Sequence, residues 1–350
     1  MISTPMLEDF TTLANKEEIY CALQGKRIYI TGSTGQIGWY LVNFLNYLIN
    51  TGKLQCEVTC HIRSEAKLAK KFPASSEYSC RFVVAENAAS ALEHDIYDLV
   101  IHCASKASPK HFAASPVDVM VPNSILTQAL LEQIRKRNPS CKFVYFSSTG
   151  VTGFIEDEQR PSQESDYGPL SCTDLGNCYL ESKRYGEMLS LAYARQYGIP
   201  VIIVRPSITY GPGFDLDDGR SYADFVQFLL RKCPIKLTSD GSAIRNFLYI
   251  SDFIKGLLLV LSKSPTGSVL NIASPFPISI LDLATLLNTS IYPESLGPVE
   301  HLKGQNQLTR VNFKSTDTSV DQLKALGWSQ TTFPLEGFRK TIRHYQELSQ

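Results

Sequence analysis

The sequence predicts an α/β fold: a doubly wound, Rossmann-type parallel sheet with a smaller C-terminal lobe. Short apolar runs rich in Val, Ile, Tyr and Phe alternate with helical patterns, which is the order of βαβ units in a parallel sheet. The runs are continuously apolar, as expected of strands covered on both faces. The glycine-containing stretch "TGSTGQIG" (31–38) joins the first run to the first long helical pattern. Together these observations favour a nucleotide-binding type of sheet.

The elements follow in order along the chain. A helical extension is expected over residues 1–24, where apolar residues recur at helical spacing. Residues 25–206 form the core and residues 207–350 mainly the lobe, interleaved with the core. Strands are expected at 26–31, 56–62, 80–86, 97–105, 141–148 and 200–206, and the main helices at 36–50, 117–137 and 174–197.

Composition excludes several classes of function. The 350 residues contain 34 basic and 34 acidic side chains, so the net charge is zero and no nucleic-acid partner is expected. No apolar run reaches the roughly 18 residues of a membrane span, and the acidic N-terminus lacks the features of a signal peptide. We therefore expect a cytoplasmic protein without a membrane partner. Its nine cysteines include no C-x-x-C pair, which indicates reduced thiols and no metal site.

The glycine turn predicts a dinucleotide site. A strand, a glycine turn and a helix bring free backbone N–H groups and a helix N-terminus to one point, an arrangement that binds pyrophosphate. Gly32 permits the tight turn, Gly35 lets the backbone approach the phosphates, and Gly38 lets helix and strand pack closely. The alternative is an ordinary glycine-rich loop.

The tip of the second expected strand favours NADP over NAD. An acidic residue there would bond the ribose 2′-hydroxyl of NAD, whereas an arginine suits the 2′-phosphate of NADP. The sequence reads "CHIRSEAK" (60–67), with Arg63 and Lys67 and no acid at the tip. NAD remains an alternative because a neutral tip can still hold it. Glu86, after the third strand, either accepts from the adenine amine or faces water.

A catalytic pair is expected on the helix after the fifth strand. Tyr179 and Lys183 in "YLESK" are four residues apart and share a helix face. A neighbouring ammonium group lowers a tyrosine pKa from about 10 toward neutrality, which would make Tyr179 a usable acid and base. Ser148, at the C-terminal end of the fifth strand, can donate to the same substrate oxygen, and such sheets bind ligands at that edge. His102 is expected to be a packed strand-end residue.

Taken together, the glycine turn, "HCAS" (102–105), Ser148 and Tyr179-x-x-x-Lys183 resemble the extended short-chain dehydrogenase/reductase family, the NAD(P)-dependent nucleotide-sugar epimerases and dehydratases. The resemblance covers about residues 25–340. Further matches are "RPSITYGPG" (205–213), "DDGRSYADF" (217–225), "RNFLYISD" (245–252), "LNIAS" (270–274) and "LGW" (326–328). The stretch from Arg205 to Asp252 is most similar to the UDP-glucuronate decarboxylase branch.

The resemblance implies roles for individual residues. Tyr179 takes the proton of the sugar hydroxyl that it holds with Ser148, and Asn123 supports the site. Thr149, Arg220 and Arg245 contact the substrate, the two arginines at its diphosphate, and the C-terminal lobe becomes substrate-binding. The implied cofactor site consists of Gly32, Thr34, Gly35, Gln36, Ile37, Gly38, Arg63, Ser105, Tyr179 and Lys183.

One departure from the family pattern narrows the chemistry. Where dehydratases carry acids after the fifth strand, the sequence reads "STGVTG" (148–153), with Thr149 and Gly150 in the acid positions and Thr152 in place of a tyrosine. Removal of water across C5–C6 needs a further acid and base, so the sequence favours a 4-epimerase or a 4-keto reductase.

Two alternatives stay open. One is a dehydratase or decarboxylase with relocated acids among Glu164, Asp166 and Glu181, the first two of which are expected to be solvated. The other is a non-catalytic sensor or scaffold that binds a dinucleotide.

A homodimer is also expected. The helices at 117–137 and 174–197 carry apolar residues at positions interpreted as outer ones, namely Leu126, Leu130, Leu189 and Tyr193. The alternative is that these four side chains pack only on the sheet.

Overall fold

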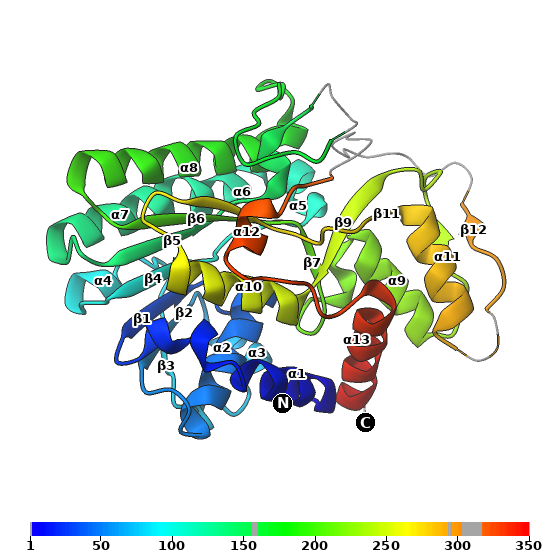
Figure 1. Cartoon of the computed structure of the whole chain (residues 1–350), viewed down its shortest axis with the longest axis horizontal. Coiled ribbons are helices and arrows are strands. Elements are labelled where there is room, and N and C mark those ends of the chain that lie inside the picture. The colour runs from blue at the N-terminus through cyan, green and yellow to red at the C-terminus, as the bar shows by residue number, and fades with distance from the viewer. Residues whose placement is uncertain (1, 156–159, 293, 295, 303–316, 350) are drawn as a thin grey trace.

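A seven-stranded parallel sheet forms the centre of the computed structural model, which describes residues 2–155, 160–292, 294, 296–302 and 317–349 (Figure 1). The strand order is β10-β6-β5-β4-β1-β2-β3, and every pairing is parallel. The strands are β1 (Arg27–Thr31), β2 (Glu57–Ile62), β3 (Arg81–Val84), β4 (Leu99–His102), β5 (Lys142–Phe146), β6 (Val201–Pro206) and β10 (Val269–Ile272). The predicted doubly wound α/β fold is confirmed.

Helices cover both faces of this sheet (Figure 1). The described helices, in the core and in the C-terminal part together, are α1 (Thr4–Ala14), α2 (Gln36–Asn50), α3 (Glu65–Lys71), α4 (Ala91–His94), α5 (Pro109–Ala114), α6 (Pro116–Asn123), α7 (Ile125–Arg137), α8 (Cys178–Tyr197), α9 (Ser221–Leu230), α10 (Ile250–Lys263), α11 (Ile280–Ser290), α12 (Asp321–Ala325) and α13 (Pro334–Leu348). Across the described ranges, none of the helices is both long and apolar enough to cross a membrane.

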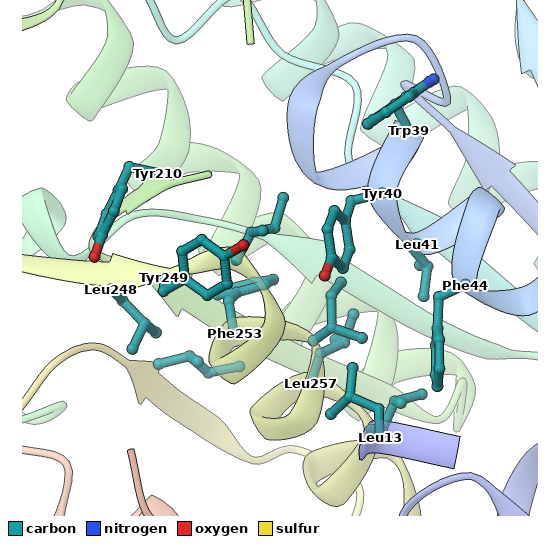
Figure 2. Packing of buried hydrophobic residues seen from close by; sticks show 14 of the residues in the cluster. Leu13, Trp39, Tyr40, Leu41, Phe44, Tyr210, Leu248, Tyr249, Phe253 and Leu257 are labelled. Atoms are coloured by element: carbon teal, nitrogen blue, oxygen red, sulfur yellow. The ribbon is translucent and has the colours of Figure 1, made fainter. Parts of the chain in front are cut away.

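The strands explain why the sheet has two separate cores. Side chains alternate along a strand, so Ile28 and Ile30 enter one core while Tyr29 enters the other. The first core contains α2 and α10 and extends to α1 and α13 (Figure 2). The second contains α4, α7 and α8. Because both faces are covered, the strands are apolar throughout, as the sequence pattern indicated.

The strand order reverses direction at β1. This strand pairs with β2 on one side, through Ile30 and Cys60, and with β4 on the other, through Thr31 and His102. Ligands of open α/β sheets bind in the crevice at such a reversal, outside the carboxyl ends of the strands. The glycine turn lies at this point.

Two features of the core differ from the sequence prediction. The helix expected over 117–137 is broken at Ser124, between α6 and α7. Pro122 lies at the break, has no N–H to donate, and gives its carbonyl oxygen to His102. The seventh strand, β10, was not predicted as part of the sheet, since its pairing with β6 joins residues more than 60 positions apart.

The chain after residue 206 builds a second small sheet and also returns to the first. Strands β7 (Ile208–Tyr210), β9 (Ile244–Tyr249) and β11 (Pro277–Ser279) pair with one another, and β8 (Lys236–Leu237) pairs with β12 (Glu300–His301). Between these strands the chain contributes α10 and β10 to the core. The boundary at residue 206 stays a prediction.

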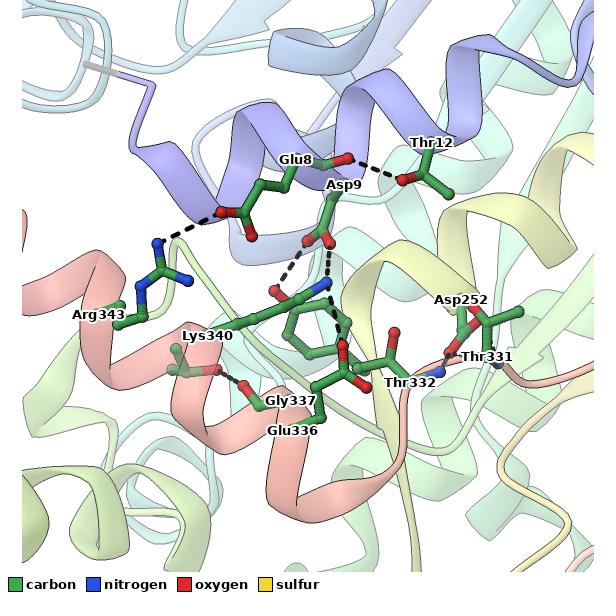
Figure 3. A network of polar contacts seen from close by, with 12 residues as sticks. Glu8, Asp9, Thr12, Asp252, Thr331, Thr332, Glu336, Gly337, Lys340 and Arg343 are labelled. Atoms are coloured by element: carbon green, nitrogen blue, oxygen red, sulfur yellow. Dashed lines mark hydrogen bonds and ion pairs between the residues drawn. The ribbon is translucent and has the colours of Figure 1, made fainter. Parts of the chain in front are cut away.

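A buried polar network ties the N-terminal segment to the C-terminal helix (Figure 3). Helix α1 is followed by two short 3₁₀ turns, Glu17–Ile19 and Cys21–Leu23. Asp9 of α1 is only 3% exposed and accepts hydrogen bonds from Tyr40 of α2, Tyr249 of β9 and Lys340 of α13. The first and last helices are therefore joined through one carboxylate.

Candidate active site

The glycine turn is shaped by backbone packing. Gly32 has a φ of +73°, and a Cβ there would lie 2.6 Å from the backbone nitrogen of Ala104, after β4. A Cβ on Gly38 would overlap the carbonyl oxygen of Gly32. Gly35 differs because it is exposed and is the N-cap of the 15-residue helix α2. The turn thus leaves the N-terminus of α2 open toward the crevice.

The residues around the turn fit a dinucleotide. The Ser105 hydroxyl is buried and has no hydrogen-bond partner among the described residues, and the open helix N-terminus suits a phosphate. Thr34 is partly exposed beside it. Ile37 packs against the core, and Gln36 donates from Nε2 to the carbonyl oxygen of Gly211, 3.1 Å away. The Ser105 hydroxyl and the uncapped N–H groups at the start of α2 can donate hydrogen bonds, as binding of a pyrophosphate and a ribose requires.

The tip of β2 carries a group of positive charges. Arg63 follows β2 directly and is exposed. Burial and the charges of Arg63 and Lys106 lower the pKa of Lys67, so these three cations lie near one another. Lys106 also forms an ion pair with Asp118, at 2.6 Å. Glu86 is exposed.

Helix α8 positions the predicted catalytic pair. Lys183 is 2% exposed and donates to the carbonyl oxygen of Phe146, the last residue of β5. Its ammonium nitrogen lies 5.8 Å from the centre of the Tyr179 ring and 5.0 Å from that of Tyr145. Burial lowers the pKa of Lys183 to about 7, against the opposing effects of Cys103 and Glu187. The lysine therefore titrates close to neutral pH.

The pKa of Tyr179 differs from the sequence prediction. Burial raises it above the ordinary value, while a hydrogen bond with Ser148 and the charge of Arg220 lower it. The expectation that Lys183 brings this pKa toward neutrality is wrong for this structure, because the lysine is itself desolvated. Ser148 is positioned by a 3₁₀ turn, Thr149–Thr152, whose Gly150 N–H donates to its hydroxyl at 3.2 Å.

An aromatic residue that the sequence analysis missed covers Tyr179. Phe112 of α5 stacks on the Tyr179 ring, with centroids 5.2 Å apart and planes 10° apart. Helix α5 is fastened to the segment before α9, because Ser108 donates to the carbonyl oxygen of Asp218 and Lys110 to that of Asp217. The stretch "PKHFAA" offers no motif that would have revealed this contact.

The two predicted substrate arginines lie in different surroundings. Arg220 forms an ion pair with Asp218 and lies over the Tyr222 ring, 5.0 Å from its centre. Its effect on the pKa of Tyr179 places its charge near the phenol. Arg245 is on β9, paired with Ile278 of β11, and donates to the Ile244 carbonyl oxygen at 2.7 Å.

The missing family acids leave an apolar environment. Thr149 is buried, and its carbonyl oxygen accepts from the Thr152 hydroxyl at 3.0 Å. A Cβ on Gly150 would lie 2.9 Å from Cδ2 of Leu180. The next residue after Tyr179 therefore fills the space where a carboxylate would stand.

The three proposed replacement acids have other partners. Glu164 is buried, and its Oε1 accepts from the backbone N–H of Asn271 in β10 at 3.0 Å, so the expectation that it is solvated is wrong. Asp166 forms an ion pair with Arg160 at 2.7 Å, and Glu181 lies 3.6 Å from Arg184.

The supporting residues have structural contacts. His102 is buried; its Nδ1 bonds the Thr31 hydroxyl at 2.7 Å and its Nε2 the Pro122 carbonyl oxygen at 2.9 Å. Burial, with a smaller effect of Lys183, lowers its pKa to about 3, so it is a neutral packed histidine. Asn123 donates to the Val119 carbonyl oxygen and to the Ser182 hydroxyl, both at 3.0 Å.

The four residues chosen for a dimer surface all contact the second core, and one of them is fully buried there. Leu130 is fully buried in the second core, and Leu126, Leu189 and Tyr193 pack against it. The interpretation as an outer position is wrong for Leu130, which is fully buried; the other three side chains are partly buried against the second core. Within the described residues, no group of three or more His, Cys, Asp and Glu side chains is arranged to hold a metal ion.

The fold and this site define the class of the protein: a Rossmann-type enzyme fold with a Ser, Tyr and Lys set beside a dinucleotide turn. The chain belongs to the NAD dependent epimerase/dehydratase family, whose sequence profile matches residues 28–273. Among similar curated proteins, UDP-glucuronic acid decarboxylase 6 of Arabidopsis thaliana is 28% identical over 318 residues, 89% of this chain and 86% of that protein. UDP-glucuronic acid decarboxylase 1 of Xenopus tropicalis is 26% identical, over 92% of this chain and 72% of that protein.

Solved structures confirm the fold. A UDP-N-acetylglucosamine 4-epimerase from Methanobrevibacter ruminantium matches with a TM-score of 0.78 at 19% identity, over 93% of this chain and 99% of that chain. A UDP-glucuronic acid 4-epimerase from Bacillus cereus, in complex with UDP-glucuronic acid and NAD, matches with a TM-score of 0.75 at 24% identity, over 92% and 99%. Both structures share the fold of this chain over nearly its whole length.

Proposed function

We propose that the protein catalyses hydride and proton exchange at C4 of a nucleotide-activated sugar, as a 4-epimerase or a 4-keto reductase. The observation that carries this proposal is the position of Tyr179 on α8: Lys183 Nζ lies 5.8 Å from the centre of its ring, and Ser148, just after β5, lies close enough to lower the pKa of its phenol. The glycine turn lies at the neighbouring strand ends of the same sheet edge.

Each residue has a defined part in this chemistry. Tyr179 accepts the proton of the C4 hydroxyl group on oxidation and returns a proton to the C4 oxygen on reduction, while Ser148 holds the same oxygen. Lys183 supplies a positive charge next to the phenol when it is protonated. Gly35, Ser105 and the N-terminus of α2 would hold the dinucleotide, whose nicotinamide ring would accept the hydride from the sugar C4 in oxidation and supply it in reduction. Phe112 excludes water from one side of the Tyr179 ring.

NADP is our preferred cofactor, with NAD as the alternative. The three cations at the tip of β2, Arg63, Lys67 and Lys106, suit a 2′-phosphate. NAD is supported by the Bacillus cereus epimerase, whose structure contains it. Titration with NADPH and NADH decides the question: we expect tighter binding of NADPH, and loss of that difference in Arg63→Ala.

A UDP-linked uronic acid is the substrate class that we propose. The curated relatives named above have names that give UDP-glucuronic acid as their substrate, and Arg220, whose charge lowers the pKa of Tyr179, remains a proposed contact of the substrate diphosphate. Thr149 and Arg245 remain proposed substrate contacts. Decarboxylation is the second candidate, because oxidation at C4 turns a uronic acid into a β-keto acid, whose loss of CO₂ needs no base at Gly150.

The test incubates the purified protein with NAD or NADPH and UDP-glucuronic acid, UDP-glucose and 4-keto sugars, and identifies products by mass spectrometry and NMR. A C4 epimer, a reduced sugar or a pentose distinguishes the three reactions. Tyr179→Phe should lower turnover at least 100-fold while cofactor affinity stays within about twofold. An unchanged rate in Tyr179→Phe would refute the catalytic assignment and favour the sensor or scaffold alternative.

We further propose a cytoplasmic homodimer formed through α6, the start of α7 and α8. These helices expose Val117, Val121, Ile125, Tyr185 and Met188, the last at 70%. Contiguous exposed apolar side chains mark association surfaces. Met188→Glu should shift the protein from dimer to monomer in sedimentation velocity. A wild-type monomer at micromolar concentration would contradict the proposal.

A further inference from the structure

A fully buried ion pair lies behind the catalytic helix. Arg205 of β6 has a side chain that is 0% exposed, and that of Glu187 of α8 is 4% exposed. The guanidinium donates from Nε to Oε1 and from Nη2 to Oε2 of Glu187, both at 2.7 Å. This bidentate geometry fixes the carboxylate in one orientation.

The position of Glu187 on α8 connects it with the catalytic pair. Tyr179, Lys183 and Glu187 follow one another at intervals of four residues, so they lie along one face of the helix. The charge of Glu187 favours the protonated form of Lys183, against the desolvation that lowers its pKa. A carboxylate held one turn away therefore helps to keep this buried lysine a cation.

The other groups around Lys183 come from the neighbouring strands. Cys103, after β4, also favours the protonated lysine, whereas the lysine disfavours a charge on His102 of β4. Tyr145 of β5 offers only its ring face. Glu187 is thus the one carboxylate among the described groups that acts on the pKa of Lys183.

The remaining donors of Arg205 hold the segment that precedes α8. Nη1 donates to the carbonyl oxygen of Glu164 at 2.9 Å, and Nη2 to the hydroxyl of Tyr167 at 2.6 Å. The guanidinium also lies over the Tyr167 ring, 5.3 Å from its centre. Since Glu164 also bonds β10 through its carboxylate, residues 164–167 are fastened to the sheet from two sides.

We propose that the Glu187–Arg205 pair is a positioning device for the reaction, in which Arg205 holds the Glu187 carboxylate one turn behind Lys183 and clamps residues 164–167 beside the catalytic helix. This inference rests on the proposed function of Tyr179 and Lys183. Stability alone does not require the pair, because buried ion pairs can often be replaced by apolar residues of similar size at little cost.

Two variants separate the effect of the Glu187 charge from the effect of the hydrogen bonds that Arg205 donates to residues 164–167. Glu187→Gln removes the negative charge while it keeps the shape of the side chain. The double variant Glu187→Gln/Arg205→Met removes both charges and all donors to residues 164–167, and leaves no buried charge unpaired. Glu132→Gln is the control for the loss of a carboxylate paired with an arginine, because Glu132 accepts from Arg135 but lies on α7 and is partly exposed.

Three measurements are made on each protein: the pH profile of kcat, the pH dependence of NADPH binding by fluorescence, and the rate of chymotryptic cleavage after Tyr167. In Glu187→Gln we expect the high-pH limb of kcat to move about one pH unit lower, which is about a tenfold loss of kcat on that limb. In the double variant the shift should have the same direction but be smaller, because a positive charge is removed as well. The pH midpoint of NADPH binding should also move to lower pH. The KM for the sugar should stay within about threefold of wild type. Cleavage after Tyr167 should accelerate at least fivefold in the double variant.

The proposal is overturned if both variants match Glu132→Gln in all three measurements. If Glu187→Gln does not fold, the double variant decides alone. If the wild-type protein turns over no nucleotide sugar, the proposed function has failed, and the binding and cleavage measurements still decide whether the pair positions Lys183 and residues 164–167.

Discussion

Replacing Asp9 with alanine should destabilise the whole fold while leaving the active site intact. The Asp9 carboxylate accepts from Lys340 Nζ at 2.8 Å, from the Tyr249 hydroxyl at 2.8 Å and from the Tyr40 hydroxyl at 3.0 Å (Figure 3). Burial raises its pKa although Lys340 opposes this, whereas Asp9 raises the pKa of Lys340. Burial therefore destabilises the charged form of Asp9, whereas the ion pair stabilises the charged form of Lys340.

The magnitude follows from what alanine leaves behind. Removing one partner of a buried ion pair costs about 3–5 kcal/mol, and each tyrosine hydroxyl loses a bond with a net value of about 1 kcal/mol. Lys340 is 18% exposed and lies 3.6 Å from Glu336, so it can recover part of its solvation. We therefore expect the free energy of unfolding to fall by about 3 kcal/mol.

The assay is urea unfolding followed by circular dichroism, with Glu8→Ala as the control. Glu8 is adjacent to Asp9 on the same helix but forms a surface pair with Arg343 at 3.3 Å, and exposed pairs contribute about 0–1 kcal/mol. Turnover per folded molecule should not change in either variant. If Asp9→Ala loses less than 1 kcal/mol, or no more than Glu8→Ala, the reasoning about the buried network is refuted.

Two further predictions concern the sheet edge. Gly38→Ala should weaken dinucleotide binding at least tenfold in calorimetry, because its Cβ overlaps the Gly32 carbonyl oxygen and forces the turn to shift; unchanged affinity would show that the turn adapts freely. His102 has its pKa lowered to about 3 by burial, against about 6.5 in an unfolded chain, so its contribution to stability is complete above pH 6.5 and is lost as the pH falls toward 3. Between pH 6.5 and pH 5, the free energy of unfolding of the wild-type protein should therefore fall by about 2 kcal/mol more than that of His102→Gln, as measured by urea unfolding. An identical pH dependence of the two proteins would contradict a buried neutral histidine.

The sequence revealed those parts of the structure that local patterns encode. Strand β1, the glycine turn and helix α2 are adjacent in the chain, and each has a local signature, so this strand–turn–helix unit could be predicted closely. Tyr179 and Lys183 were found for the same reason, since a spacing of four residues suffices to place them on one helix face.

The rest depends on contacts between distant segments. The stacking of Phe112 on Tyr179 joins residues 67 positions apart, and neither residue shows this in its neighbourhood. Glu164 resembled a solvated loop acid until its bond with Asn271 of β10 was seen. The inward orientation of Leu130 depends on the rotation of α7, which the break at Ser124 resets. Periodicity identifies an apolar face but does not say which surface covers it.

The pKa of Lys183 shows how these distant contacts set the chemistry. Spacing alone suggested a charged lysine that lowers the pKa of its tyrosine. In the structure, Lys183 is buried and donates to the carbonyl oxygen of Phe146 at the end of β5, and this burial lowers the pKa of the lysine itself. The site thus depends on a lysine near its titration point, with Ser148 and Arg220 favouring the phenolate instead. Position 150 carries no acid, and packing restricts what it can carry. A Cβ on Gly150 would lie 2.9 Å from Cδ2 of Leu180, the residue after Tyr179. An acid introduced at Gly150 would therefore require the Leu180 side chain to move. The packing of α8 thus bears directly on whether an acid can be accommodated at this position.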